Sequence, residues 1–369
     1  MSRASGGHAA HNNGTPGQVH LTWGDDPATS VVVSWASPGR AQRPRVRIGQ
    51  RVIFAQEKAH VDKGTGKTAW CYHARVPGLR PGAAYGYAVT ADNDAGAGDP
   101  FTSTFRTAPA GRAGFRFTCS GDLAVAGYEG AAHLAGAVES LQPLFHLLTG
   151  GPGEPGPDSW RAFGDGSQLS AASRPWMPVP SARDEAGMAR YLARYALPSG
   201  GSLAAAGRWY SFRVGPAVFA CLDRGDLGQC DQGGPGPDAG GASSDSQTQW
   251  LGRTLAAARA DSSVDWIIVC AHARREEWLP LFDQHAVDLV LCGHGGDRDW
   301  SAPALTLGHG GHGYAIAAVT IAGPEDADEP TLAASCLSAI ASSDDVTEWG
   351  RFTLTRSRRA ARRQAGRAR

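Results

Sequence analysis

The chain has 369 residues, and its 35 Lys and Arg balance 35 Asp and Glu, so the formal net charge is zero. This balance gives no global attraction to nucleic acid or to an anionic membrane surface, and no apolar run approaches the roughly 20 residues that cross a bilayer. The length allows two or three domains. Because residues 1–17 contain no apolar signal-peptide region, we expect a soluble, cytoplasmic protein.

The first predicted domain is all-β and covers residues 18–109, after a segment over residues 1–17 that we expect to be disordered. Short strands such as QVHLTW (18–23) and SVVVSW (30–35) are separated by turn-rich segments, without a helical period. The stretch GLRPGAAYGYAV (78–89) places a turn before a Tyr-bearing strand. This pattern is typical of a fibronectin-III-like sandwich.

From residue 115 onward, predicted strands alternate with predicted helices. The strands include residues 115–120, 143–149, 217–222, 265–271 and 287–292, and the helices lie near residues 131–140, 246–260 and 276–285. Such alternation predicts a layered α/β domain, which we place over residues 115–337. Functional side chains in these sheets follow the carboxyl ends of strands, where the sequence has Asp122, Asp223, His272 and His294.

Two further features complete the chain-order analysis. Seven Cys occur without CxxC spacing, which excludes zinc-ribbon and thioredoxin motifs, and we expect Cys119, Cys270 and Cys292 to be buried free thiols. Residues 338–369 are polar and then densely basic. We expect a disordered tail there, with weak nucleic-acid contact through the segment from Arg356 to Arg369 as the alternative.

Several stretches together resemble the purple acid phosphatases of the calcineurin-like metallophosphoesterase superfamily. They are GQVHLTWGDDPATSVVVSW (17–35), FRFTCSGDL (115–123), RPWMP (174–178), RWYSF (208–212), DWIIVCAH (265–272) and VDLVLCGH (287–294). The resemblance covers about residues 18–337. It implies a β-sandwich followed by a domain with two mixed sheets flanked by helices. It also implies acid phosphatase activity on phosphate monoesters at a dinuclear centre of Fe(III) with Zn, Mn or Fe(II).

The resemblance further implies seven metal ligands, of which this chain keeps three: Asp122, His272 and His294. The other positions of the family motifs have changed: the bridging Asp is Gly151, the Tyr is Glu154, the Asn is Ala182, the last His is Gly296, and the substrate-facing His is Arg183. Two divalent ions about 3.5 Å apart repel by roughly 19 kcal/mol at an effective dielectric constant of about 20. Without the bridging carboxylate, we expect either no metal or one weakly bound divalent ion.

Neighbouring residues could replace some of the lost ligands. Glu154, Asp184, Asp297 and Asp299 are acidic and close in sequence to lost positions, and His309 or His312 could add an imidazole. We expect Asp223 to support the site without binding metal. Arg183 could bind a phosphate oxyanion bidentately without any metal.

The sequence therefore predicts a purple acid phosphatase-like metallophosphoesterase whose metal centre has decayed, leaving an impaired hydrolase or a pseudoenzyme. One alternative is a residual phosphomonoesterase that uses a single divalent ion at His272 and His294. Another is a phosphate-binding or interaction module, in which the sandwich and the Arg-rich tail make the contacts. The expected ligand is phosphate or a phosphomonoester, and no membrane contact is expected.

Overall fold

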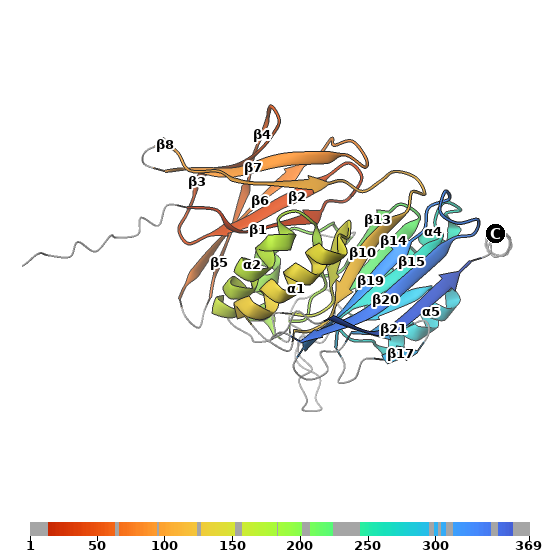
Figure 1. The fold of residues 1–369 in the computed structure, drawn as a ribbon. Helices are drawn as coiled ribbons and strands as arrows, with labels where there is room; N and C mark the ends of the chain where they lie inside the picture. Colours follow the sequence, from red (N-terminus) through yellow and green to blue (C-terminus); the bar gives the residue numbers. More distant parts are fainter. Residues whose placement is uncertain are drawn as a thin grey trace, which may run out of the picture.

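The protein is described here by a computed structural model. It describes residues 14–62, 66–93, 96–123, 127–151, 157–182, 184–200, 207–223, 244–294, 299–301, 304–307, 313–340 and 346–356. Two regions are visible in Figure 1: a sandwich formed by the red and orange strands, and an α/β domain formed by the rest of the chain. Among the described helices, none combines the length and the apolar character that a bilayer span needs.

The N-terminal region is a sandwich of two sheets, as predicted. One sheet has the strand order β1-β2-β6-β5, and the other has β4-β3-β7-β8 with β9 paired to β7. Its buried core includes Trp35 and Tyr72, whose rings stack with centroids 5.6 Å apart. The strands are β1 (Gly17–Trp23), β2 (Val31–Ser37), β3 (Gln42–Ile48), β4 (Arg51–Phe54), β5 (Gln56–Val61), β6 (Thr68–Val76), β7 (Ala84–Asn93), β8 (Gly96–Ala97) and β9 (Phe101–Arg106).

The second domain contains two six-stranded mixed sheets. The first has the order β12-β11-β10-β19-β20-β21, and the second has β13-β14-β15-β16-β18-β17. The first sheet consists of β10 (Phe115–Ser120), β11 (Phe145–Leu148), β12 (Trp176–Pro178), β19 (Gly313–Ile321), β20 (Thr331–Ile340) and β21 (Val346–Thr355). The second consists of β13 (Tyr210–Val214), β14 (Ala217–Leu222), β15 (Trp266–Ala271), β16 (Leu289–Cys292), β17 (Asp299–Ser301) and β18 (Ala304–Thr306).

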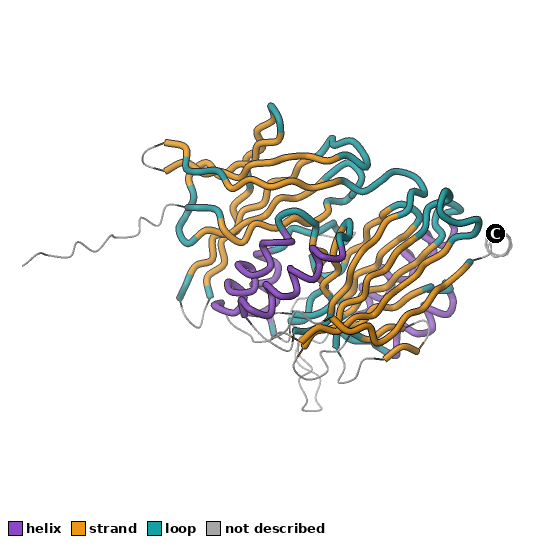
Figure 2. Tube along the Cα trace, in the orientation of Figure 1, coloured by secondary structure: helices purple, strands orange, loops and turns teal. Residues whose placement is uncertain are grey.

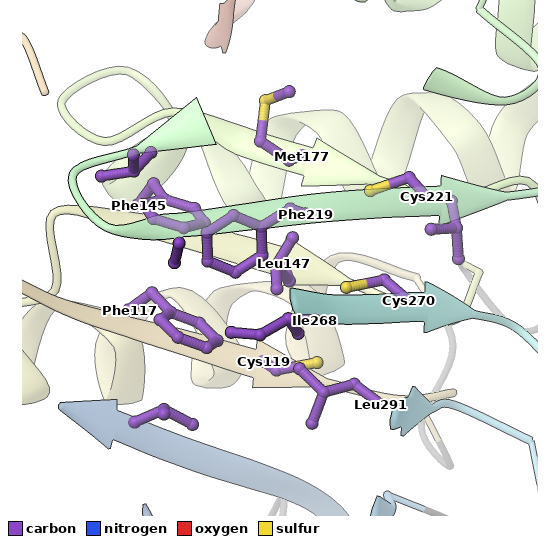
Figure 3. Close-up of a cluster of buried hydrophobic side chains, with 14 of the residues drawn as sticks. Phe117, Cys119, Phe145, Leu147, Met177, Phe219, Cys221, Ile268, Cys270 and Leu291 are labelled. Carbon is purple, nitrogen blue, oxygen red and sulfur yellow. The ribbon is translucent and has the colours of Figure 1, made fainter. Parts of the chain in front are cut away.

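Alternating residues of the strands build two different cores. In β15, Ile268 and Cys270 join the cluster between the sheets, whereas Ile267 and Val269 join the cluster on the outer face. This division follows from the two-residue period of a strand that is buried on both faces. Figure 3 shows side chains of both sheets meeting in the inner cluster. The cysteines of the described residues are free and buried, which confirms the expectation for Cys119, Cys270 and Cys292.

Helices cover the outer faces of both sheets (Figure 2). Apolar residues of α1 (Gly127–Leu141) and α2 (Pro157–Ala171) pack on the first sheet, and residues of α4 (Ser244–Ala260) and α5 (Leu279–Gln284) pack on the second. A 3₁₀ turn, η1 (Glu276–Trp278), precedes α5. These elements include the three predicted helices. The observed architecture is thus a fibronectin-III-like sandwich followed by an α/β domain with two mixed sheets.

The C-terminal boundary predicted from the sequence is wrong. Residues after 337 were expected to be a disordered tail, but β20 continues to Ile340 and pairs antiparallel with β21. The reason is an alternating pattern in β21: Phe352 and Leu354 are half-buried, while Arg351, Thr353 and Thr355 are exposed. Arg356 then reaches the second sheet, where its Nη1 lies 2.8 Å from Asp288 Oδ1. Residues 357–369 lie outside the described part of the chain.

Helix α3 (Glu185–Arg194) belongs to the α/β domain and contacts the sandwich. Its N-cap is Asp184, which accepts a hydrogen bond from the Gly187 backbone amide at 2.6 Å. Side chains of the sandwich reach backbone carbonyls at its other end, which a helix leaves without partners. These contacts are Lys58 Nζ to Leu192 at 2.5 Å, His73 Nε2 to Ala193 at 3.1 Å, His20 Nε2 to Arg194 at 2.9 Å and Thr22 Oγ1 to Ala196 at 2.7 Å.

Acid should destabilise this fold through His146 in β11. The ring is buried, with Nδ1 2.8 Å from Thr118 Oγ1 and Nε2 3.0 Å from Ser120 Oγ. Burial lowers the pKa of His146 to about 3, whereas an unfolded His titrates near 6.5. The unfolded chain therefore binds the proton first as pH falls. Between about pH 6.5 and pH 3, this group should remove up to ~1.4 kcal/mol of unfolding free energy per pH unit.

Urea denaturation between pH 4 and 7 checks this expectation with the variant His146→Asn. The variant should be less stable overall, but its unfolding free energy should fall less steeply as the pH decreases. The difference in slope should correspond to the uptake of up to one proton on unfolding. His133→Asn, at an exposed position of α1, is the matched control and should keep the wild-type slope. An unchanged slope in His146→Asn would show that this imidazole is not the acid-sensitive group.

Candidate metal site

Three predicted side chains meet where strands of both sheets end. Asp122 follows β10 of the first sheet, while His272 follows β15 and His294 follows β16 of the second. One ligand atom from each residue can be chosen so that all three lie within 4.8 Å of one another. His294 Nδ1 lies 3.2 Å from Asp122 Oδ2, and His272 Nδ1 lies 3.8 Å from Asp122 Oδ1. The two sheets therefore contribute to a single cluster.

Backbone contacts between the loops fix this arrangement. The Asp122 amide donates to the Gly293 carbonyl at 3.1 Å, and the His294 amide donates to the His272 carbonyl at 2.7 Å. A Cβ atom on Gly121 would lie only 1.9 Å from the Leu307 carbonyl oxygen. Glycine is required at this position because the backbones approach more closely than any side chain permits.

The three side chains differ in exposure and support. His272 is 3% exposed, and its Nδ1 lies 3.0 Å from the Thr149 carbonyl oxygen, which can only accept a hydrogen bond. Nδ1 must therefore carry the proton, which leaves the lone pair of the neutral ring on Nε2. Asp122 is 21% exposed and His294 is 49% exposed. The cluster is thus rigid on the His272 side and open to solvent on the His294 side.

A neighbouring thiol does not add a fourth metal ligand to these three residues at neutral pH. Cys292 ends β16, two residues before His294, and is buried. Burial raises the pKa of the Cys292 thiol to about 11. Since the thiolate is the form that binds metal, this side chain stays a protonated core residue.

The glycine at the predicted bridging position makes a different contact. The Gly151 amide donates to Asp122 Oδ1 at 3.1 Å. A Cβ atom on Gly151 would meet Ser181 Oγ at 2.4 Å. The next residue, Ala182, offers no donor atom where the resemblance places an Asn. The described side chains at these two positions therefore supply neither the bridging carboxylate nor the amide oxygen.

Other predicted residues have structural partners or lie outside the described chain. Asp184 is the N-cap of α3. Asp223 is buried and pairs with Arg208, with Nη2 at 2.6 Å and Nε at 2.7 Å, while its amide donates to Gln247 Oε1. Asp299 begins β17, and only its backbone is described. The remaining candidates lie outside the described residues: Arg183, Glu154, Gly296, Asp297, His309 and His312.

Sequence comparison identifies the N-terminal domain, and structural comparison identifies the whole fold. Residues 16–107 match the family described as purple acid phosphatase, N-terminal domain. The structure also matches purple acid phosphatase PPD1 from yellow lupin (Lupinus luteus) seeds with a TM-score of 0.69 and 14% identity, covering 94% of this chain and 76% of that chain. Residues 16–107 thus form a purple acid phosphatase N-terminal domain, and the chain as a whole has the fold of the lupin protein.

Two curated relatives of the chain come from Mycobacterium tuberculosis strains. They are the uncharacterized proteins MT2654 and Rv2577, and each is 32% identical over 326 residues. The alignment covers 75% of this chain and 60% of either relative. The chain therefore spans less than two thirds of the length of these relatives.

Among the described residues, the donors at this site do not fit a dinuclear metal centre. Such a centre needs a bridging carboxylate to offset the repulsion of two cations, and position 151 has none. The remaining donors, one carboxylate and two imidazoles, match the three protein ligands of a single divalent site with an open position. The hydrogen bond from His272 to Thr149 is the kind of outer contact that orients a ligating imidazole.

Two residues of the site were missed by sequence reasoning. Thr149 contributes through its backbone carbonyl, and no side-chain pattern signals such a role. Ser181 fills the space beside Gly151, and its position could have been suspected because it adjoins Ala182 in the altered third motif.

Proposed function

We propose that this chain is a metallophosphoesterase-fold protein that binds one divalent metal ion through Asp122, His272 and His294. We further propose that it is impaired in the two-metal hydrolysis of phosphate monoesters. The observation that supports both parts is the convergence of these three donors beside a glycine at position 151. The ligand that we expect at the open side is phosphate or a phosphomonoester.

Each of the three donors contributes differently to metal binding. His272 is held by Thr149, so little side-chain freedom is lost when its ring binds an ion. Asp122 supplies the negative charge, and the exposure of His294 leaves room for an anionic ligand on that side. A bound divalent ion would supply Lewis-acid polarisation of a phosphoryl oxygen.

A metal-free scaffold is the second candidate function. The contact of 3.2 Å between Asp122 Oδ2 and His294 Nδ1 already satisfies two of the donor groups without an ion. In this case the chain would be a pseudoenzyme, and the cluster would only stabilise the loops.

Metal titration separates the two candidates. Calorimetric titration of the full chain with Zn²⁺ or Mn²⁺ should give one ion per chain, and His294→Ala should weaken the affinity by about a hundredfold or more, because two donors cannot hold the ion. His133→Ala on the exposed face of α1 is the matched control and should bind like the wild type. Two ions per chain would overturn the one-metal proposal, and no bound ion would favour the pseudoenzyme.

Activity gives an independent measurement. With p-nitrophenyl phosphate, the metal-loaded chain should turn over at least roughly a thousandfold more slowly than a two-metal phosphatase, since only one of the two metal roles is supplied. Any residual rate should disappear in His294→Ala. A rate typical of a two-metal enzyme would contradict the proposed impairment.

A further inference from the structure

A second cavity, separate from the Asp122 cluster, lies between the sandwich and the α/β domain. Its volume is about 570 Å³, and its walls come from β1, β2, β5 and β6 of the sandwich and from α2 and α3. None of Asp122, His272 and His294 lines it. Volumes of roughly 300–1,000 Å³ are typical of pockets for small organic molecules.

The described charged residues of this cavity leave one positive charge in excess. Four cations line it, and three carboxylates face them, which gives a surplus of one. Three of the cations are paired: Arg190 with Asp62, Lys67 with Asp158, and Arg161 with Asp165. The fourth cation is Arg194.

Arg194 is held in place without a carboxylate among the described residues. Its Nη1 donates to Gln18 Oε1 at 2.5 Å, and its guanidinium carbon lies 6.0 Å from the centre of the Trp160 ring. A neutral amide and an aromatic face orient a guanidinium without neutralising it. A guanidinium prepared in this way can bind a carboxylate or phosphate group.

We propose that this cavity binds a small organic anion, whose carboxylate or phosphate group is recognised by Arg194. Apolar wall residues such as Pro16, Pro38 and Ala69 would contact its organic part. The cavity is larger than an inorganic ion needs, which favours an organic ligand. This site is independent of the proposed metal site, because the two have no lining residue in common.

Binding of benzoate and of phenylphosphonate to the full chain tests the proposal, with neutral benzamide as the reference compound. Calorimetry should detect one site for at least one of the anions at concentrations up to about 10 mM and none for benzamide. Arg194→Gln should weaken that binding about tenfold or more, since a charge-assisted hydrogen bond is lost.

Two controls keep the outcomes distinct. Arg161→Gln removes another lining cation, one already paired with Asp165, and should change the affinity by less than about twofold. His294→Ala should leave it unchanged even if metal binding is lost. The proposal is overturned if neither anion binds, if Arg194→Gln binds like the wild type, or if His294→Ala abolishes binding.

Discussion

Gly121→Ala is expected to destabilise the protein by about 3 kcal/mol or more and to abolish metal binding. The added Cβ would lie 1.9 Å from the Leu307 carbonyl oxygen and 2.6 Å from the Gly293 carbonyl oxygen. Both obstacles are backbone atoms, so no side-chain rotation can relieve the overlap. The loops that hold Asp122 and His294 must therefore move apart. Chemical denaturation and metal titration of the variant measure the two effects.

Gly136→Ala is the matched control for this substitution. Gly136 lies in α1, and a Cβ atom there would meet nothing within 4 Å. Ala is favoured over Gly inside a helix by roughly 0.8–1 kcal/mol, so this variant should be slightly stabilised and should leave the proposed metal binding unchanged. If Gly121→Ala behaves like Gly136→Ala, then the loops are not locked as described.

Phe145→Ala should cost about 3–5 kcal/mol of unfolding free energy. Phe145 is fully buried between the sheets, and its ring centre lies 5.4 Å from Phe117 and 5.3 Å from Phe219. Figure 3 shows these rings together in the inner cluster. Removing the central ring leaves a cavity that the two hydrogen-bonded sheets cannot collapse to fill.

Phe54→Ala provides the comparison for Phe145→Ala. Phe54 is 57% exposed in β4, so this truncation should change stability by no more than about 0.5 kcal/mol. Urea denaturation of both variants gives the difference directly. Equal losses of unfolding free energy in the two variants would mean that the main hydrophobic core does not lie between the sheets.

Much of the fold could be predicted because its strands are short apolar runs with sharp ends. The segments that end at Ala271 and Cys292 are buried on both faces, so their residues are apolar throughout and stand out from the chain. The carboxyl ends of parallel strands then place Asp122, His272 and His294 at one edge. That these three meet within ligand reach follows from the packing of two sheets, which no local pattern specifies.

The errors in the sequence analysis have identifiable causes. Strand β21 was taken for part of a tail because its half-buried Phe352 and Leu354 alternate with Arg351, Thr353 and Thr355, and because a dense basic run follows. An edge strand with one solvated face has this composition. Asp184 was considered as a substitute ligand from its position in the altered motif, but a carboxylate directly before a helix is also a good N-cap, and the structure has it in that role.

The sandwich side chains that contact the carbonyls of α3 limit how far the two domains can change independently of each other. Helix α3 starts directly after the loop that contains Ser181 and Ala182, and its far end is bound by Lys58, His73 and His20. The sandwich thus holds in place the loop beside Gly151 in the second domain. Exchanging the sandwich for that of a relative would therefore shift the loop that contains Ser181 and Ala182, unless the residues that make these contacts were exchanged with it.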